Sequence, residues 1–252
     1  MTVVVTGPDP FFVAVMIALL GFLIGVTTGG FNGVGSLLTP LLSLVLPVSS
    51  AVGVLLPMLI VGDACALYTY WGEWDGKLVW RLLPAGLAGA LAGTYVLTAC
   101  SPNALRMALA LFVFVIIGYT VVSERILAWR YQPHVWHGPV VGAVAGVASG
   151  MFNNGGPAFN AYLLLQGLPP RAFIATTALF FALLNWLKVP GFVFTGVLDR
   201  ALLSSVWWVF PFIPLGIVTA RRLVTRIRPI VFERIIVWLL VMSSMLLLVQ
   251  SF

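Results

Sequence analysis

Long apolar stretches separated by short polar joints run along almost the whole chain. Runs of about 18 or more residues with few charges are typical of transmembrane helices. The pattern therefore predicts an all-α, polytopic transmembrane helical bundle that forms a single membrane domain over residues 1–252. The apolar runs are 11–28, 35–46, 51–71, 78–98, 104–122, 138–150, 157–166, 172–196, 201–218 and 230–249.

The composition supports this prediction and excludes a nucleic-acid-binding protein. Only 8% of the residues are charged, against about 25% in soluble proteins. The net charge of +6 comes from basic residues that lie between apolar runs. We interpret them as topology determinants, so the lipid bilayer, and no nucleic acid, is the expected partner of this surface.

The two halves of the chain resemble each other. The segment GVTTGGFNGVGS (25–36) matches GVASGMFNNGGP (146–157), 121 positions later. This similarity predicts a duplication, with repeat one over 11–122 and repeat two over 138–250. Further pairs follow at slowly growing offsets: Pro47 with Pro169, Asp63 with Asn185, Asp75 with Asp199, and Pro102 with Pro229.

Each half has five apolar runs, and the first two are short. They form either two crossings or one re-entrant hairpin, so each half crosses the membrane an odd number of times and the second repeat is expected to be inverted. The basic residues agree, because nine lie in joints that inverted topology puts on one side and two (Arg106, Arg200) on the other. The positive-inside rule then puts both termini outside the cytoplasm. The nine are Lys77, Arg81, Arg125, Arg130, Arg171, Arg221, Arg222, Arg226 and Arg228.

The stretch GMFNNGGPAFNAYLL (150–164) interrupts an apolar region with polar residues. Unpaired backbone amides cost several kcal/mol in hydrocarbon, so a broken helix persists only inside protein or beside water. In inverted-repeat transporters such breaks aim helix N-termini at an anion. Gly155 and Gly156 permit positive φ and close approach, and Asn153 and Asn154 offer neutral donors.

The first half carries a matching break in FNGVGS. It supplies Asn32, Gly33, Gly35 and, as a candidate cap, Ser36. Two such breaks related by a pseudo-two-fold axis predict one anion site between them. The alternative is an ordinary tight turn between short helices.

Polar residues inside the last long runs are further candidates for the site. Lys188 either pairs with an anionic substrate or snorkels to the outer interface, and Pro190-Gly191 beyond it predicts an opening of the helix. Asp63 is a functional candidate because an intramembrane carboxylate is costly. It either carries a proton or pairs permanently with a cation such as Lys188. Asn185 matches Asp63 in the repeat, and Thr176 and Thr177 either contact a ligand or bond back to their own helix.

The sequence gives little support for an enzymatic or metal-binding site. The chain has no HExxH, GxSxG or Walker-type loop, and His134 and His137 have no further ligand nearby. Cys65 and Cys100 are expected to be small buried packing residues. We therefore expect no metal, no cofactor and no enzymatic activity.

The stretch SGMFNNGGPAFNAYLLLQGLPPRAFIATTALFFALLNWLKVPGFVFTG resembles the signature region of the TauE/SafE-type sulfite and organosulfonate exporter family. AVGVLLPMLIVGDACALYTYWGEWD and LLPAGLAGALAGTYVL in the first half are also similar to it. The resemblance covers roughly residues 11–250 and is most specific at Asn185, Lys188 and Pro190. FNGVGS departs from it, because it lacks the Lys-Gly-Gly-like text that members often carry there.

The resemblance implies a multi-pass permease of the bacterial inner membrane. It would be a secondary transporter, expected to export sulfite, an organosulfonate or a related carboxylate by alternating access, driven by protons or another ion. A passive anion channel is the main alternative. A membrane-embedded enzyme, a non-transporting partner of a sulfur-metabolism complex and a homodimer remain open.

Overall fold

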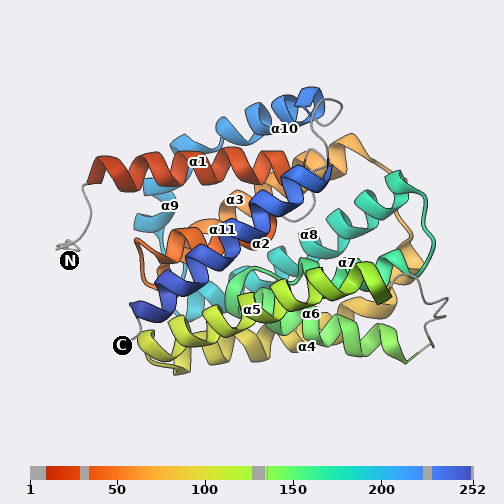
Figure 1. Ribbon diagram of the computed structural model, residues 1–252, viewed down its shortest axis with the longest axis horizontal. Coiled ribbons are helices and arrows are strands. Elements are labelled where there is room, and N and C mark those ends of the chain that lie inside the picture. The colour runs from red at the N-terminus through yellow and green to blue at the C-terminus, as the bar shows by residue number, and fades with distance from the viewer. Residues whose placement is uncertain (1–9, 29–33, 127–133, 135, 224–228, 251–252) are drawn as a thin grey trace.

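The computed structural model describes residues 10–28, 34–126, 134, 136–223 and 229–250. These residues form a bundle of helices without a strand, so the predicted all-α class is confirmed (Figure 1). The helices are α1 (Pro10–Thr28), α2 (Gly35–Ser43), α3 (Val48–Thr69), α4 (Gly76–Ala99), α5 (Pro102–Ile126), α6 (His137–Phe152), α7 (Gly156–Leu164), α8 (Pro170–Phe194), α9 (Arg200–Val206), the 3-10 helix η1 (Trp207–Val209), α10 (Phe212–Leu223) and α11 (Pro229–Val249).

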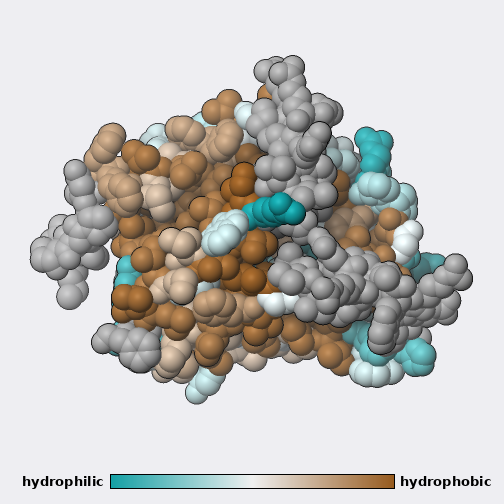
Figure 2. Space-filling view, in the orientation of Figure 1, coloured by the Kyte–Doolittle hydropathy of each residue, from teal (hydrophilic) through white to brown (hydrophobic). Residues whose placement is uncertain are grey.

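Membrane-spanning character is shared by helices of both halves. Within the described residues, five helices (α1, α3, α4, α5 and α8) are long and apolar enough to cross a membrane, and a bent pair makes up to six. The bent pair covers 200–220 and turns by 42° near η1, where the sequence predicts one continuous run. Figure 2 shows a largely hydrophobic face, with hydrophilic residues mainly near its right edge. The polytopic membrane prediction is confirmed.

Equivalent residues begin equivalent helices in the two halves. Pro47 and Pro169 directly precede α3 and α8. The side chains of Asp75 and Asp199 accept hydrogen bonds from backbone N–H groups three residues later, at the starts of α4 and α9. Such N-caps satisfy amides that have no partner within the helix. The order of elements therefore repeats at the offsets seen in the sequence, while the inverted orientation of the halves stays a prediction.

The first helix of each half packs along the fourth segment of the other half. α6 lies along α4, and α1 lies along α10. Glycines make this approach close: a Cβ at Gly146 would collide with the carbonyl oxygen of Gly86, and one at Gly25 with that of Ile213. Small residues are common at helix–helix contacts in membranes, since they let backbones come together.

Contacts between helix ends connect joints that the charge pattern assigns to the same side of the membrane. Arg171, in the first turn of α8, forms a 3.4 Å ion pair with Glu73, before α4. Arg106, at the start of α5, donates to the carbonyl of Gln250, just after α11, at 3.3 Å. The start of α1 and the end of α11 lie at one end of the bundle (Figure 1). The side of the membrane that each end faces stays a prediction.

The short helices α2 and α7 favour the hairpin over the pair of crossings. Each has nine residues, about 14 Å of helix, against a hydrocarbon core of about 30 Å. The last residue of α1, Thr28, packs beside Gly62, seven residues before the end of α3. The broken segments therefore turn back inside the bundle.

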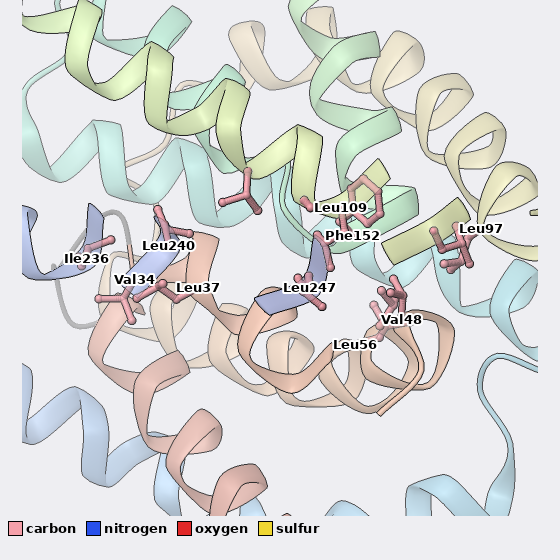
Figure 3. Packing of buried hydrophobic residues seen from close by; sticks show 14 of the residues in the cluster. Val34, Leu37, Val48, Leu56, Leu97, Leu109, Phe152, Ile236, Leu240 and Leu247 are labelled. Atoms are coloured by element: carbon pink, nitrogen blue, oxygen red, sulfur yellow. The ribbon is translucent and has the colours of Figure 1, made fainter. Parts of the chain in front are cut away.

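A hydrophobic cluster from both halves surrounds the second break. Phe152, the last residue of α6, packs with Val48 of α3, Leu109 of α5 and Leu247 of α11 (Figure 3). Between helices in a membrane, such side chains stabilise the bundle by van der Waals packing rather than by removal from water. This packing fixes the end of α6 at a defined depth in the bundle.

Two smaller expectations are corrected. Cys65 and Cys100 are free cysteines, but neither is buried: Cys65 is half-buried, and Cys100 is exposed because it follows the last turn of α4. α8 does not open at Pro190 and continues to Phe194. A proline removes only its own amide bond, and packed neighbours in a membrane bundle tolerate the bend.

Candidate functional site

The α6–α7 break consists of a helix end followed at once by a helix start. The backbone N–H groups of Asn153 and Asn154 bond back to Ser149 and Ala148, at 3.0 and 3.2 Å, and close the last turn of α6. Asn153 adopts a left-handed conformation with φ of 52°, which asparagine tolerates better than most residues. α7 then begins at Gly156, with Pro157 in its first turn, where a missing N–H costs least.

The glycines of this break act differently from what the sequence suggests. Positive φ falls on Asn153, whereas Gly155 has φ of −78°. Gly155 is needed for close approach, because a Cβ there would collide with the carbonyl oxygen of Ala145 on α6. A Cβ at Gly156 would meet only the Asn160 amide, at 3.9 Å.

The two breaks lie against each other. The Asn154 side chain is buried and donates from Nδ2 to the backbone carbonyl of Ser36, in the first turn of α2, at 3.3 Å. The hydroxyl of Thr39, also in α2, donates to the carbonyl of Phe152. Gly35 begins α2 beside this contact. Asn32 and Gly33, the other candidates in the first break, lie outside the described residues.

Lys188 of α8 is buried at the second break. Its side chain is 1% exposed, so the snorkelling interpretation is wrong. Nζ donates to Asn153 Oδ1 at 2.9 Å and to Ser149 through Oγ at 3.0 Å and the backbone oxygen at 3.1 Å. An ammonium has three N–H donors, and all three acceptors are uncharged. Nζ also lies 5.7 Å from the centroid of the Phe192 ring.

Asn153 connects this lysine to the first half of the chain. While its Oδ1 accepts from Lys188, its Nδ2 donates to the carbonyl of Val52 in α3 at 2.8 Å. One amide side chain therefore joins α8, the break and α3.

Asp63 and Asn185 form a second polar contact between α3 and α8. Asn185 Nδ2 donates to Asp63 Oδ2 at 2.7 Å. The structure thus brings together two residues that occupy equivalent positions in the repeats. Asn185 is buried and stands three residues before Lys188, about one helical turn away. Among the described residues, Asp63 makes no ion pair with Lys188.

The two threonines lie apart from the lysine. Thr176 accepts from the backbone N–H of Asp75 at 2.9 Å, and Thr177 donates to Asn160 Oδ1 of α7 at 3.2 Å. Twelve residues separate Thr176 from Lys188, about 18 Å of helix. Neither contact is a bond back to their own helix, and both fasten the start of α8 to neighbouring segments.

Sequence reasoning missed several groups of this cluster. Ser149 stands four residues before Asn153, on the same helical face, so its spacing was a usable signal. Thr39 has no comparable signal. The carbonyls of Val52 and Phe152 are backbone groups, which no residue type reveals.

The arrangement is suited to a small anion. An ammonium group and the starts of two helices gather where the breaks meet, and helix N-termini carry partial positive charge. In the part of the chain that the structure describes, Lys188 has no acidic partner within ion-pair distance. An anion reaching Nζ would replace neutral acceptors with a negative charge.

Comparison with known proteins gives one match. The family model described as "Sulfite exporter TauE/SafE" matches residues 17–247. No curated protein and no solved structure matches the chain.

Proposed function

The chain belongs to the sulfite exporter TauE/SafE family, and from this premise we propose that it is a secondary transporter exporting a small anion across the bacterial inner membrane. Its substrate would be sulfite, an organosulfonate or a related carboxylate. The family and the apolar helices support a membrane transporter, and we expect transport rather than catalysis.

One observation carries this proposal: Lys188 is buried where two broken helices meet, and it is held there by neutral groups only. Burying a charge without a counter-charge in direct contact is costly, and this cost favours a site that receives a negative ligand. We place the substrate against Lys188 and Asn153, between the starts of α2 and α7. Gly35, Ser36, Asn154, Gly155 and Gly156 would surround it, with Asn32 and Gly33 from the first break.

Alternating access is the mechanism we infer for this site. Each broken hairpin packs on a helix of the opposite half. If the two hairpins exchanged their packing arrangements, the site would open first to one side of the membrane and then to the other. The sequence has no nucleotide-binding loop, so we expect an ion or substrate gradient to drive transport.

A thermal-shift screen of the purified protein tests the substrate class. Sulfite, sulfoacetate, taurine, thiosulfate, lactate and malonate would each be added at increasing concentration. We expect at least one anion to raise Tm in a concentration-dependent way, because a ligand stabilises the state that binds it. If only neutral or cationic solutes raise Tm, the anion proposal is wrong.

Flux into proteoliposomes separates a carrier from a passive channel. A carrier saturates with substrate, because each molecule requires a conformational cycle. Flux that rises linearly, or single-channel currents, would establish the channel instead.

A further inference from the structure

Asn185 connects two opposite charges on facing helices, because it contacts Asp63 of α3 and stands one helical turn before Lys188 on α8. Asp63 is the one acidic residue in the five candidate membrane spans that the structure describes, which are Phe11–Thr28, Val48–Thr69, Gly76–Ala99, Pro102–Tyr119 and Pro170–Phe194. It is held by Asn185, three residues before Lys188 on the facing helix α8. The negative charge of Asp63 and the positive charge of Lys188 therefore offset each other, although these two residues form no direct ion pair in the described part of the chain.

The partner of Asp63 is compatible with either protonation state. An asparagine amide offers both N–H donors and a carbonyl acceptor. It donates to an ionised carboxylate, as observed at 2.7 Å, and after rotation it accepts from a protonated carboxyl. An arginine or lysine in direct contact would hold the carboxylate ionised. Asp63 is also only partly covered by the side chains around it.

The other helices that pack on α3 bring no charge to Asp63. α1 and α2 contain no ionisable residue. The rest carry ionisable residues only towards their ends, and none of these residues that the structure describes contacts Asp63. The nearby ionisable groups are therefore Lys188 of α8 and the Cys65 thiol, two residues further along α3. The other ionisable groups of these helices are Arg106, Tyr119, Glu124 and Arg125 of α5, His137 of α6, Arg171 of α8, Arg200 of α9, and Arg221 and Arg222 of α10.

We propose that Asp63 is the proton site of a proton–anion cotransporter, in which each monovalent anion bound at Lys188 brings one proton onto the Asp63 carboxylate. This inference rests on the proposed function. In the empty protein, Asp63 and Lys188 compensate each other. A bound anion balances the positive charge of Lys188 in place of Asp63. The carboxylate of Asp63 is then an excess negative charge in a region of low dielectric constant. A proton from water adds to a carboxylate oxygen, which gives a neutral carboxyl and restores the balance.

This coupling has a consequence for energetics. The proton and the anion move together, so one cycle carries no net charge. The membrane potential then does not drive transport, and the gradients of anion and proton set its direction. An uncoupled anion carrier would respond to the potential directly.

Isothermal titration calorimetry measures the proton directly. Isethionate, a monovalent sulfonate that stays ionised near neutral pH, and sulfite would be titrated into the full-length protein. Two buffers of different ionisation enthalpy reveal the protons taken up. We expect about one proton per isethionate, and an affinity that falls up to about tenfold per pH unit while the empty protein has Asp63 ionised. The matched variant Asp63→Asn keeps the size and polarity of the side chain and should bind without proton uptake or pH dependence.

Each outcome is decisive. If neither isethionate nor sulfite nor any other anion of the thermal-shift screen binds the wild type, the proposed function fails and this inference with it. If isethionate binds the wild type without proton uptake, only this inference fails. If Asp63→Asn takes up the same proton, the assignment to Asp63 is wrong.

Proteoliposomes test the coupling without a variant, in case Asp63→Asn does not fold. We expect isethionate flux to be unchanged when a potassium diffusion potential is imposed, and to change when a pH gradient is imposed. Flux that follows the potential and ignores the pH gradient would overturn the proposal.

Discussion

The side-chain amide of Asn154 donates a hydrogen bond to the backbone carbonyl of Ser36, 118 positions earlier in the chain, at 3.3 Å. The first residue lies in the break between α6 and α7, and the second lies in the first turn of α2. Thr39 makes a second connection, to the carbonyl of Phe152. The two interrupted segments are thus fastened to each other inside the bundle.

Replacing Asn154 with alanine should loosen this contact. The amide is buried, and losing a buried hydrogen bond costs about 1–3 kcal/mol. We expect Asn154→Ala to lower the Tm of the purified protein by several degrees. Asn103→Ala, at an exposed position at the start of α5, is the matched control and should leave Tm unchanged. Equal Tm values for the two variants would show that the contact contributes nothing to stability.

A carboxylate side chain at position 153 should take the place of the substrate anion in the proposed site. Asn153 Oδ1 lies 2.9 Å from Lys188 Nζ, so Asn153→Asp places a fixed negative charge beside the ammonium. The carboxylate keeps the contact with Lys188 as a charge-assisted pair and loses the bond that Nδ2 donates to the carbonyl of Val52. With its fold verified by circular dichroism, we expect this variant to lose any rise in Tm caused by sulfite. Asn103→Asp adds the same charge at an exposed site and should keep the wild-type response. A normal response of Asn153→Asp to sulfite would place the anion elsewhere.

The sequence predicted the broken helices and the repeat, because glycine, proline and asparagine leave a clear signal in an apolar chain. The equivalence of Asp75 with Asp199 was visible, and both residues cap helices. The same alignment paired Asp63 with Asn185, but the contact between their side chains is a finding of the structure.

Other parts of the site depend on how helices pack, which the sequence does not show. Whether Lys188 snorkels or stays inside depends on the direction its side chain takes from α8. Its acceptors on α6 are fixed only when α6 packs nearby. The sequence places Thr176 and Thr177 in the same candidate site as Lys188, because all three are polar residues of one helix. In the structure about three turns of that helix separate the threonines from the lysine.

Glycine at position 146 should be required for the contact between α4 and α6. A Cβ there would collide with the carbonyl of Gly86, whereas a Cβ at Gly118 of α5 would meet nothing within 4 Å. We expect Gly146→Ala to destabilise the protein by about 1–3 kcal/mol and Gly118→Ala to be neutral or slightly stabilising. Thermal unfolding in detergent measures both. The helices would have to pack differently if Gly146→Ala were as stable as Gly118→Ala.

Thiol labelling tests the predicted orientation in the membrane. Cys100 is exposed at the end of α4, and Arg171 lies at the start of α8, which is predicted to face the cytoplasm. In right-side-out vesicles, a membrane-impermeant maleimide should label Cys100. In a Cys65→Ser, Cys100→Ser background it should not label Arg171→Cys until the vesicles are opened. The reverse pattern would place both termini in the cytoplasm.

The most direct measurement of the central claim is saturable sulfite flux into proteoliposomes containing wild type, Lys188→Gln or Arg171→Gln. The last variant removes an exposed cation whose ion pair with Glu73 is remote from the breaks. We predict that Lys188→Gln, with its fold verified by circular dichroism, loses at least about tenfold of the saturable flux and that Arg171→Gln keeps it. Wild-type flux in folded Lys188→Gln would contradict an anion site built on Lys188 at the junction of the two broken helices.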